Sequence, residues 1–102
     1  MKRIEIFVRH DAELDVFGYF QYIHDAAQHL LEAIDSTLQG LGLQPLKGRL
    51  RKFRGADLRN IRSWRVDGFE NYLIFYRLTK SRLEILRIKH GAMDFPRALK
   101  ES

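Results

Sequence analysis

The run Tyr72-Leu73-Ile74-Phe75-Tyr76-Arg77-Leu78 is apolar at both odd and even positions. A β-strand alternates its side chains between two faces, so an apolar residue at nearly every position is typical of a central strand. The run therefore predicts a sheet with this segment in its interior, and the rest of the chain must supply its neighbours.

Two flanking segments qualify as the neighbouring strands. Leu58 to Val66 is a candidate strand before the run, separated from it by a turn of about five residues that opens at Asp67-Gly68. Leu83 to Lys89 is a candidate strand after it, beyond a turn at Lys80-Ser81, and His90-Gly91 ends it. Both connections are too short for a crossover, so the three strands should form an antiparallel meander.

The N-terminal half predicts one strand and a helical hairpin. Residues 4–9 alternate apolar and polar side chains, which is typical of a strand with one buried face. Asp11 is a candidate N-cap for a first helix, whose apolar stripe contains Val16, Phe20, Ile23 and Ala27, widened by Leu14 and Phe17. A second helix should start at Asp25 and stop at Gly40 or Gly42. Its apolar face consists of Ala27, Leu30, Leu31, Ile34, Leu38 and Leu41.

The order of elements is therefore strand, helix, helix, strand, strand, strand. This order predicts an α+β domain of two layers, in which the helical hairpin over residues 11–39 packs on one face of the sheet. The chain has 102 residues, and a core of that size supports a single domain over residues 1–102.

Composition excludes several classes of protein. The chain has no cysteine, which removes disulfide scaffolds, thiolate nucleophiles and cysteine-based zinc sites. It has no apolar run of the roughly 18 residues that a membrane span needs. Met1-Lys2-Arg3-Ile4 leads into a strand pattern rather than a signal peptide. We therefore expect a cytoplasmic protein without a membrane association.

Charge is divided unevenly along the chain. Residues 1–46 carry a net charge of −4 and residues 47–102 carry +9. Within residues 47–65 eight cations are opposed only by Asp57; they are Lys47, Arg49, Arg51, Lys52, Arg54, Arg59, Arg62 and Arg65. Arginine suits bidentate contacts to carboxylate or phosphate, so this density favours a docking surface for an anionic partner over a merely solvated face.

Signals for catalysis or cofactor binding are weak. His24 and His29 have no converging third ligand, no serine lies in a nucleophile elbow, and no glycine-rich phosphate loop is present. We expect neither a metal nor a cofactor. The aromatic residues Trp64, Tyr72, Phe75 and Tyr76 fit either a core or a base-stacking platform, with the core favoured. His90 is either an acid–base group or a residue that hydrogen-bonds to the following turn.

Several segments together resemble the RelE/ParE toxin superfamily of bacterial type II toxin–antitoxin modules. They are Leu58-Arg59, Arg62-Ser63-Trp64-Arg65-Val66, Tyr72 to Arg77, and Ile85 to Asp94. The most specific parts are Ile-Phe-Tyr-Arg in the central strand and a last strand that runs into His-Gly-Ala-Met-Asp. Family members usually have arginine where this chain has Met93, which puts its toxicity in question.

The resemblance implies one of two mechanisms. RelE-like members are ribosome-dependent mRNA nucleases, and in this chain Arg62, Arg77 and His90 would be the catalytic residues. ParE-like members lack that catalytic set and are associated with poisoning DNA gyrase. No tyrosine follows Tyr76 and the tail offers few cations, which favours the ParE-like branch. A further alternative is a non-toxic remnant that only binds its antitoxin.

The leading hypothesis is therefore a ParE-like toxin that inhibits gyrase by binding and is neutralised by a cognate antitoxin. The antitoxin is expected to lay a helix against the helical hairpin and to place acidic groups near the arginines. The residues predicted to dock the target or the antitoxin are Arg51, Lys52, Arg54, Arg59, Arg62, Arg65, Arg77, Arg87, Lys89, His90 and Asp94.

Overall fold

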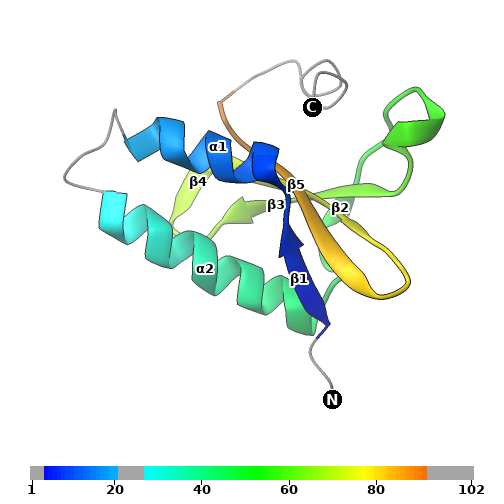
Figure 1. Ribbon diagram of the computed structural model, residues 1–102, viewed down its shortest axis with the longest axis horizontal. Helices are drawn as coiled ribbons and strands as arrows, with labels where there is room; N and C mark the ends of the chain where they lie inside the picture. Colours follow the sequence, from blue (N-terminus) through cyan, green and yellow to red (C-terminus); the bar gives the residue numbers. More distant parts are fainter. Residues whose placement is uncertain (1–3, 21–26, 92–102) are drawn as a thin grey trace.

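The computed structural model describes residues 4–20 and 27–91, with the side chain of Phe20 excepted. Figure 1 shows the elements in their chain order. They are β1 (Glu5–Val8), α1 (His10–Phe20), α2 (Ala27–Leu43), β2 (Arg49–Leu50), the 3₁₀ turn η2 (Ala56–Leu58), β3 (Ile61–Val66), β4 (Phe69–Leu78) and β5 (Arg82–His90).

The strands form one sheet in the order β1-β5-β4-β3-β2. The antiparallel meander of β3, β4 and β5 is confirmed, and β4 lies at the centre as its apolar run predicts. β1 pairs in parallel with β5, from Glu5 opposite Arg82 to Val8 opposite Ile85, after the chain has crossed over through the helices. The predicted α+β class is confirmed, with β2 as a strand that the sequence did not indicate.

The core has two parts because β4 is buried on both sides. Tyr72, Ile74 and Tyr76 belong to the main cluster beneath the helices. Phe75 belongs to a smaller cluster on the opposite face, with Leu58 among its members. The aromatic residues of β4 are therefore core residues, as the sequence favoured.

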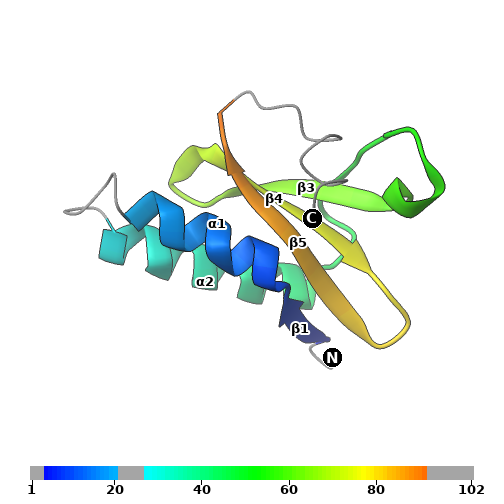
Figure 2. The ribbon, with the colours of Figure 1, turned by 45° about the horizontal axis from the view of Figure 1, so that its top comes forward.

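The two helices lie side by side against the sheet (Figures 1 and 2). α2 buries residues at helical spacing, namely Leu30, Ile34, Thr37, Leu38, Leu41 and Gly42. The predicted stop at Gly40 or Gly42 is wrong, because the helix continues to Leu43. A β-carbon on Gly40 would lie only 3.2 Å from the Lys47 ammonium, so this glycine makes room for a close neighbour.

α1 differs more from its predicted face. It begins at His10 rather than after an Asp11 cap, and Leu14 and Phe17 are 55% and 70% exposed. Its inner side carries Ala12, which is fully buried, and Tyr19, which packs against the main cluster. The predicted start of the second helix at Asp25 and the stripe residue Ile23 lie outside the described residues.

The boundaries of β3 also differ from the prediction. The strand begins at Ile61 instead of Leu58, because Ala56–Leu58 forms a 3₁₀ turn and Asn60 adopts a left-handed conformation with φ 60°. β4 begins at Phe69, so the β3–β4 turn is the pair Asp67-Gly68 rather than five residues. Gly68 has φ 80°, which suits glycine at a tight hairpin turn.

Neither described helix is long and apolar enough to span a membrane.

Candidate protein-docking surface

The segment between α2 and β3, residues 44–60, here called the basic segment, carries most of the exposed lysines and arginines among the described residues. Its start is fixed by contacts to Tyr76 and Arg62. The Gly48 N–H donates to the Tyr76 hydroxyl at 2.8 Å, in a buried contact. Arg62 Nη1 donates to the carbonyls of Gly48 at 2.9 Å and Leu46 at 3.3 Å. Burial raises the pKa of the Tyr76 hydroxyl. A side chain at position 48 would overlap the tyrosine ring, so glycine is required there.

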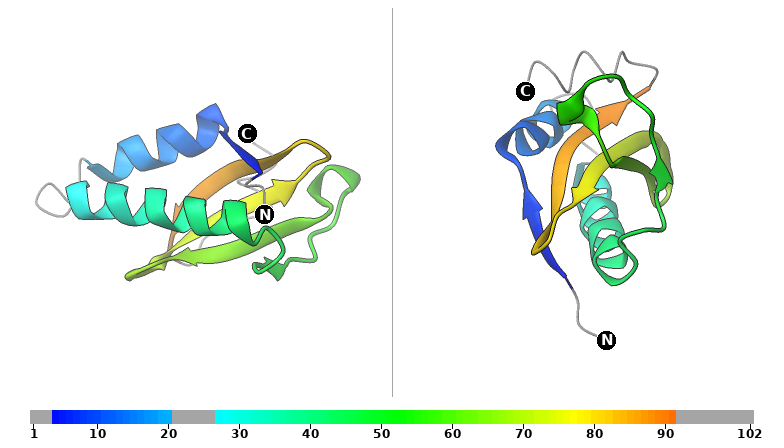
Figure 3. Two further views of the ribbon diagram at one scale, coloured as in Figure 1. Left: turned by 90° about the horizontal axis from the view of Figure 1, so that it is seen from below. Right: turned by 90° about the vertical axis from the view of Figure 1, so that its right-hand side faces the viewer.

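Residues 51–60, here called the basic loop, cover the face of the sheet opposite the helices. Leu58 is 4% exposed and belongs to the smaller core cluster, and Phe53 packs near Phe75 with ring centroids 6.3 Å apart. Arg77 Nη2 donates to the Asp57 carbonyl at 2.9 Å, while its Nε is buried without a hydrogen-bond partner among the described residues. Figures 1 and 3 show the loop at the end of the molecule opposite the start of α2.

The cations of β2, the basic loop and β3 divide into exposed and engaged groups. Arg51 is half-buried, donates to Ser63 Oγ at 3.2 Å and lies over the Phe53 and Phe75 rings. Five others are exposed: Arg49, Lys52, Arg54, Arg59 and Arg65. We call these five exposed residues the basic surface, and no acidic side chain is recorded as paired with any of them in the described part of the chain.

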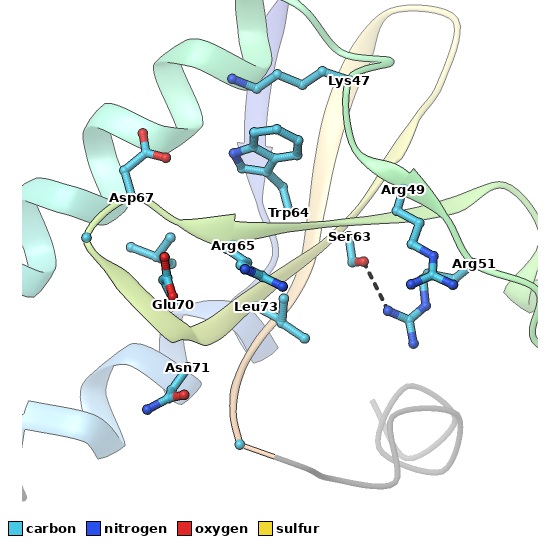
Figure 4. A pocket seen from close by; sticks show the side chains of 13 residues that line it. Lys47, Arg49, Arg51, Ser63, Trp64, Arg65, Asp67, Glu70, Asn71 and Leu73 are labelled. Carbon is cyan, nitrogen blue, oxygen red and sulfur yellow. Dashed lines mark hydrogen bonds between the residues drawn. The ribbon is translucent and has the colours of Figure 1, made fainter.

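A broad open hollow of about 1070 Å³ lies beside this surface (Figure 4). Arg49, Arg51 and Arg65 line it, together with the apolar Leu73. The Lys47 ammonium lies 4.7 Å from the centre of the Trp64 ring in the same hollow. The arrangement concentrates positive charge in a concave site next to the sheet, where an anionic partner would be attracted.

Arg87 and Lys89, which were predicted to dock a partner, are instead engaged inside the protein. The Asp15 carboxylate of α1 accepts three hydrogen bonds, from Arg87 Nε at 2.9 Å, from Arg87 Nη2 at 2.9 Å and from Lys89 Nζ at 3.2 Å. The three side chains are only 9–14% exposed. The Asp15 hydrogen bonds raise the pKa of the Arg87 guanidinium. These two cations extend from β5 beside α1, and β4 separates β5 from β3.

Asp15 also covers the edge of β5 beyond the end of β1. Its Oδ2 accepts the Ile88 N–H at 3.0 Å, and the Tyr19 hydroxyl donates to the Ile88 carbonyl at 2.8 Å. Burial and the nearby Asp15 carboxylate raise the pKa of Tyr19 to about 12. No such role for Asp15 was predicted from the sequence. The missed signal was an acidic residue one turn from Ala12 and Tyr19, on the buried side of the helix.

The three residues predicted for a RelE-like active site are not brought together. Arg62 pairs with Tyr76 and Arg77 with Ile61, so the two arginines extend from opposite faces of the sheet. His90 pairs with Tyr72, which is five residues along β4 from Arg77, or roughly 16 Å at the rise of a strand. The His90 ring lies at an exposed strand end, with its centroid 4.6 Å from that of Tyr72 and the two rings tilted by 56°.

Asp94 and Met93 lie outside the described residues. Within residues 4–20 and 27–91, no group of three or more histidine, aspartate or glutamate side chains could hold a metal ion.

Comparison with known proteins connects this geometry to a family. The sequence model described as "ParE toxin of type II toxin-antitoxin system, parDE" matches residues 6–95. The chain belongs to the ParE toxin family. The predicted resemblance to the ParE-like branch of the RelE/ParE superfamily is thereby confirmed.

A solved structure described as the chromosomal ParDE TA system from P. aeruginosa has the same fold as this ParE-family chain. Its TM-score is 0.69 at 16% sequence identity, and the match covers 88% of this chain and 98% of the other. At this identity the likeness concerns the fold. No curated protein sequence matches the chain.

The helical hairpin of this ParE-family chain exposes large apolar side chains. Leu14 and Phe17 are three residues apart on the outer side of α1, and Leu31 of α2 is 43% exposed. Exposed leucine and phenylalanine at helical spacing are typical of a surface that receives another helix.

Proposed function

We propose that this ParE-family chain inhibits DNA gyrase by binding, acts in the cytoplasm, and is held inactive by a cognate antitoxin. The observation that carries the proposal is the family match together with five exposed cations on β2, the basic loop and β3. Internal ion pairs occupy Arg87 and Lys89, whereas the five cations of the basic surface are exposed to a partner.

Binding is a better explanation than catalysis for this geometry. Arg62 and Arg77 donate to backbone carbonyls that hold the basic segment in place, and His90 lies far from both along the sheet. General acid–base catalysis needs its groups within hydrogen-bond reach of one reacting atom. The arrangement therefore supports a docking surface held by a rigid scaffold.

The antitoxin is proposed to use two surfaces of the chain. An amphipathic helix would cover Leu14 and Phe17 on the hairpin, and acidic groups would lie near the basic surface. Opposite charge raises the association rate and selects the correct partner, and neutralisation follows if the antitoxin covers the cations that gyrase needs.

A supercoiling assay with purified bacterial gyrase, relaxed plasmid and the full chain tests the first part. We expect supercoiling to decrease as the chain is added, and unchanged supercoiling at saturating chain contradicts the proposal. Cleavage of message on translating ribosomes, mapped by primer extension, would indicate the nuclease mechanism instead.

Co-expression tests the second part. Overexpression of the chain alone should halt growth with signs of DNA damage, and the product of the adjacent gene should restore growth. Harmless overexpression with retained binding to that product would identify a non-toxic remnant.

A further inference from the structure

The outer edge of β3 is covered over only half of its length. β2 pairs Arg49 with Ser63 and Leu50 with Arg62, and the Arg51 N–H donates to the Ile61 carbonyl at 2.8 Å. From Trp64 to Val66, no described strand pairs with β3 on that side. An uncovered strand edge presents unpaired N–H and C=O groups that can template another strand.

The alternation of the ladder identifies which residue offers those groups. Ile61 and Ser63 direct their backbone toward β2, and the next residue of the same parity is Arg65. The Arg65 N–H and C=O are therefore oriented toward the open side, in line with the path that a longer β2 would follow. This is the geometry in which an extended peptide adds to a sheet.

Side chains on both sides of this edge form the hollow in Figure 4. On the face opposite the helices, the hollow is lined by Arg49, Arg51, Arg65 and Leu73. On the helix-covered face, it is lined by Lys47 and Trp64. A single charged residue would suffice to discourage unwanted pairing at an edge. Four cations around a concave site of about 1070 Å³ exceed that need and indicate a bound anionic group.

Acidic side chains at one end of the hollow distinguish a peptide from a nucleic acid. Asp67 and Glu70 lie at the β3–β4 turn, opposite the end where Arg49 and Arg51 lie. A phosphate backbone carries negative charge along its whole length and would be repelled at the turn. A peptide can place acidic residues near the arginines and neutral or basic residues near the turn.

We propose that the Trp64–Val66 edge of β3 binds an extended acidic segment of a partner protein, which adds to the sheet as a strand in line with β2. This inference rests on the proposed neutralisation by an antitoxin, and it assigns the segment to that partner. The Arg65 backbone supplies the ladder hydrogen bonds, and Lys47, Arg49, Arg51 and Arg65 select acidic side chains.

Fluorescence anisotropy with a labelled model peptide tests the inference on the full chain. The probe is an end-blocked eight-residue peptide of alternating glutamate and valine, and its lysine–valine counterpart is the charge control. We expect the acidic peptide to bind and the basic one not to bind. Arg65→Gln should weaken binding by about fivefold or more, whereas Lys80→Gln, which removes an exposed charge on the β4–β5 turn, should change it by less than about twofold.

N-methylation of the peptide separates strand addition from charge attraction alone. Methylating alternate backbone nitrogens blocks either the N–H groups that face β3 or those that face solvent. Strand addition predicts that one methylated series loses binding by about tenfold or more and the other retains it. Equal binding by both series overturns the inference, as does no binding of the acidic peptide at about 1 mM.

Two further outcomes are distinguishable. Short single-stranded DNA that binds more tightly than the peptide, with the same Arg65→Gln sensitivity, would assign the hollow to nucleic acid and overturn the inference. Peptide binding in a chain that leaves gyrase unaffected would retain the strand-addition site while refuting the proposed target.

Discussion

The β5 side and the β3 side of the sheet use positive charge in opposite ways. At the β5 edge, Arg87 and Lys89 share Asp15 of α1, and all three side chains are nearly buried. At the β3 side, the basic loop covers the smaller cluster, which has four buried residues among those described. The cations of that loop and its neighbouring strands stay exposed.

This difference shows that net charge alone does not identify a functional surface. Arg87 and Lys89 stabilise the contact between α1 and β5, and Arg62 and Arg77 hold the basic segment through its carbonyls. The basic half of the chain therefore has cations that hold the fold together and cations that stay exposed. We propose that the exposed ones dock a partner.

The largest effect is expected from removing Asp15, the acid that pairs with the two cations of β5. Asp15→Ala leaves two cations nearly buried without their partner, and the free energy of unfolding should fall by about 3–5 kcal/mol in urea denaturation. Glu13→Ala, an exposed acid on the same helix, should change it by less than about 0.5 kcal/mol. Similar losses for both variants would contradict the assignment of Asp15.

A smaller loss is expected from disturbing the anchor of the basic segment. Gly48→Ala places a methyl group against the Tyr76 ring and hydroxyl, which should cost about 2 kcal/mol of stability and speed tryptic cleavage within the basic loop. Gly18→Ala is the matched control. It lies in α1 with open space around it, so stability should rise by about 0.5–1 kcal/mol. Unchanged stability and cleavage in Gly48→Ala would mean that the loop is held elsewhere.

A pH effect of about 1 kcal/mol should come from Tyr19 on the helical face. Its pKa is about 12 in the folded chain and near 10 when unfolded, so the unfolded state releases this proton first. Stability is therefore retained below pH 10 and decreases between pH 10 and 12. Because Tyr19 is only half-buried, the loss is smaller than the full shift implies. Tyr19→Phe should lessen the decrease in alkaline urea titrations, and an identical decrease would exclude Tyr19 as the source.

The smallest change in stability should follow from neutralising the basic surface. Arg49→Gln and Arg65→Gln should each alter the free energy of unfolding by less than about 0.5 kcal/mol, because both side chains are exposed. Thermal or urea unfolding measures this directly. A fall of more than about 2 kcal/mol in the free energy of unfolding of either variant would show that the arginine stabilises the fold.

Local patterns predicted most of the framework. The apolar run at residues 72–78 identified the central strand, and helical spacing identified the inner face of α2. The order of elements and the short turns then gave the meander and the α+β class. The five residues of the basic surface all lie within the dense run of cations at residues 47–65, and their role in docking stays a prediction.

Long-range contacts account for what the sequence did not reveal. Asp15 and Arg87 form an ion pair although they are 72 residues apart in the sequence, so the pair depends on how α1 packs against β5. Gly40 lies inside α2 with the Lys47 ammonium close to it, a neighbour that the local sequence does not reveal. The backbone contacts of Arg62 and Arg77 likewise exist only once the basic segment has folded onto the sheet.

The central claim is that gyrase is engaged through the exposed cations of the basic surface. Gyrase supercoiling should be measured with the parent chain, with Arg54→Gln/Arg59→Gln, and with Arg9→Gln/Lys80→Gln, which removes the same charge outside that surface. We expect inhibition by the parent chain, at least about a tenfold loss of inhibition for the first pair, and less than about a twofold change for the second. No inhibition by the parent chain, or equal losses for both pairs, would contradict it.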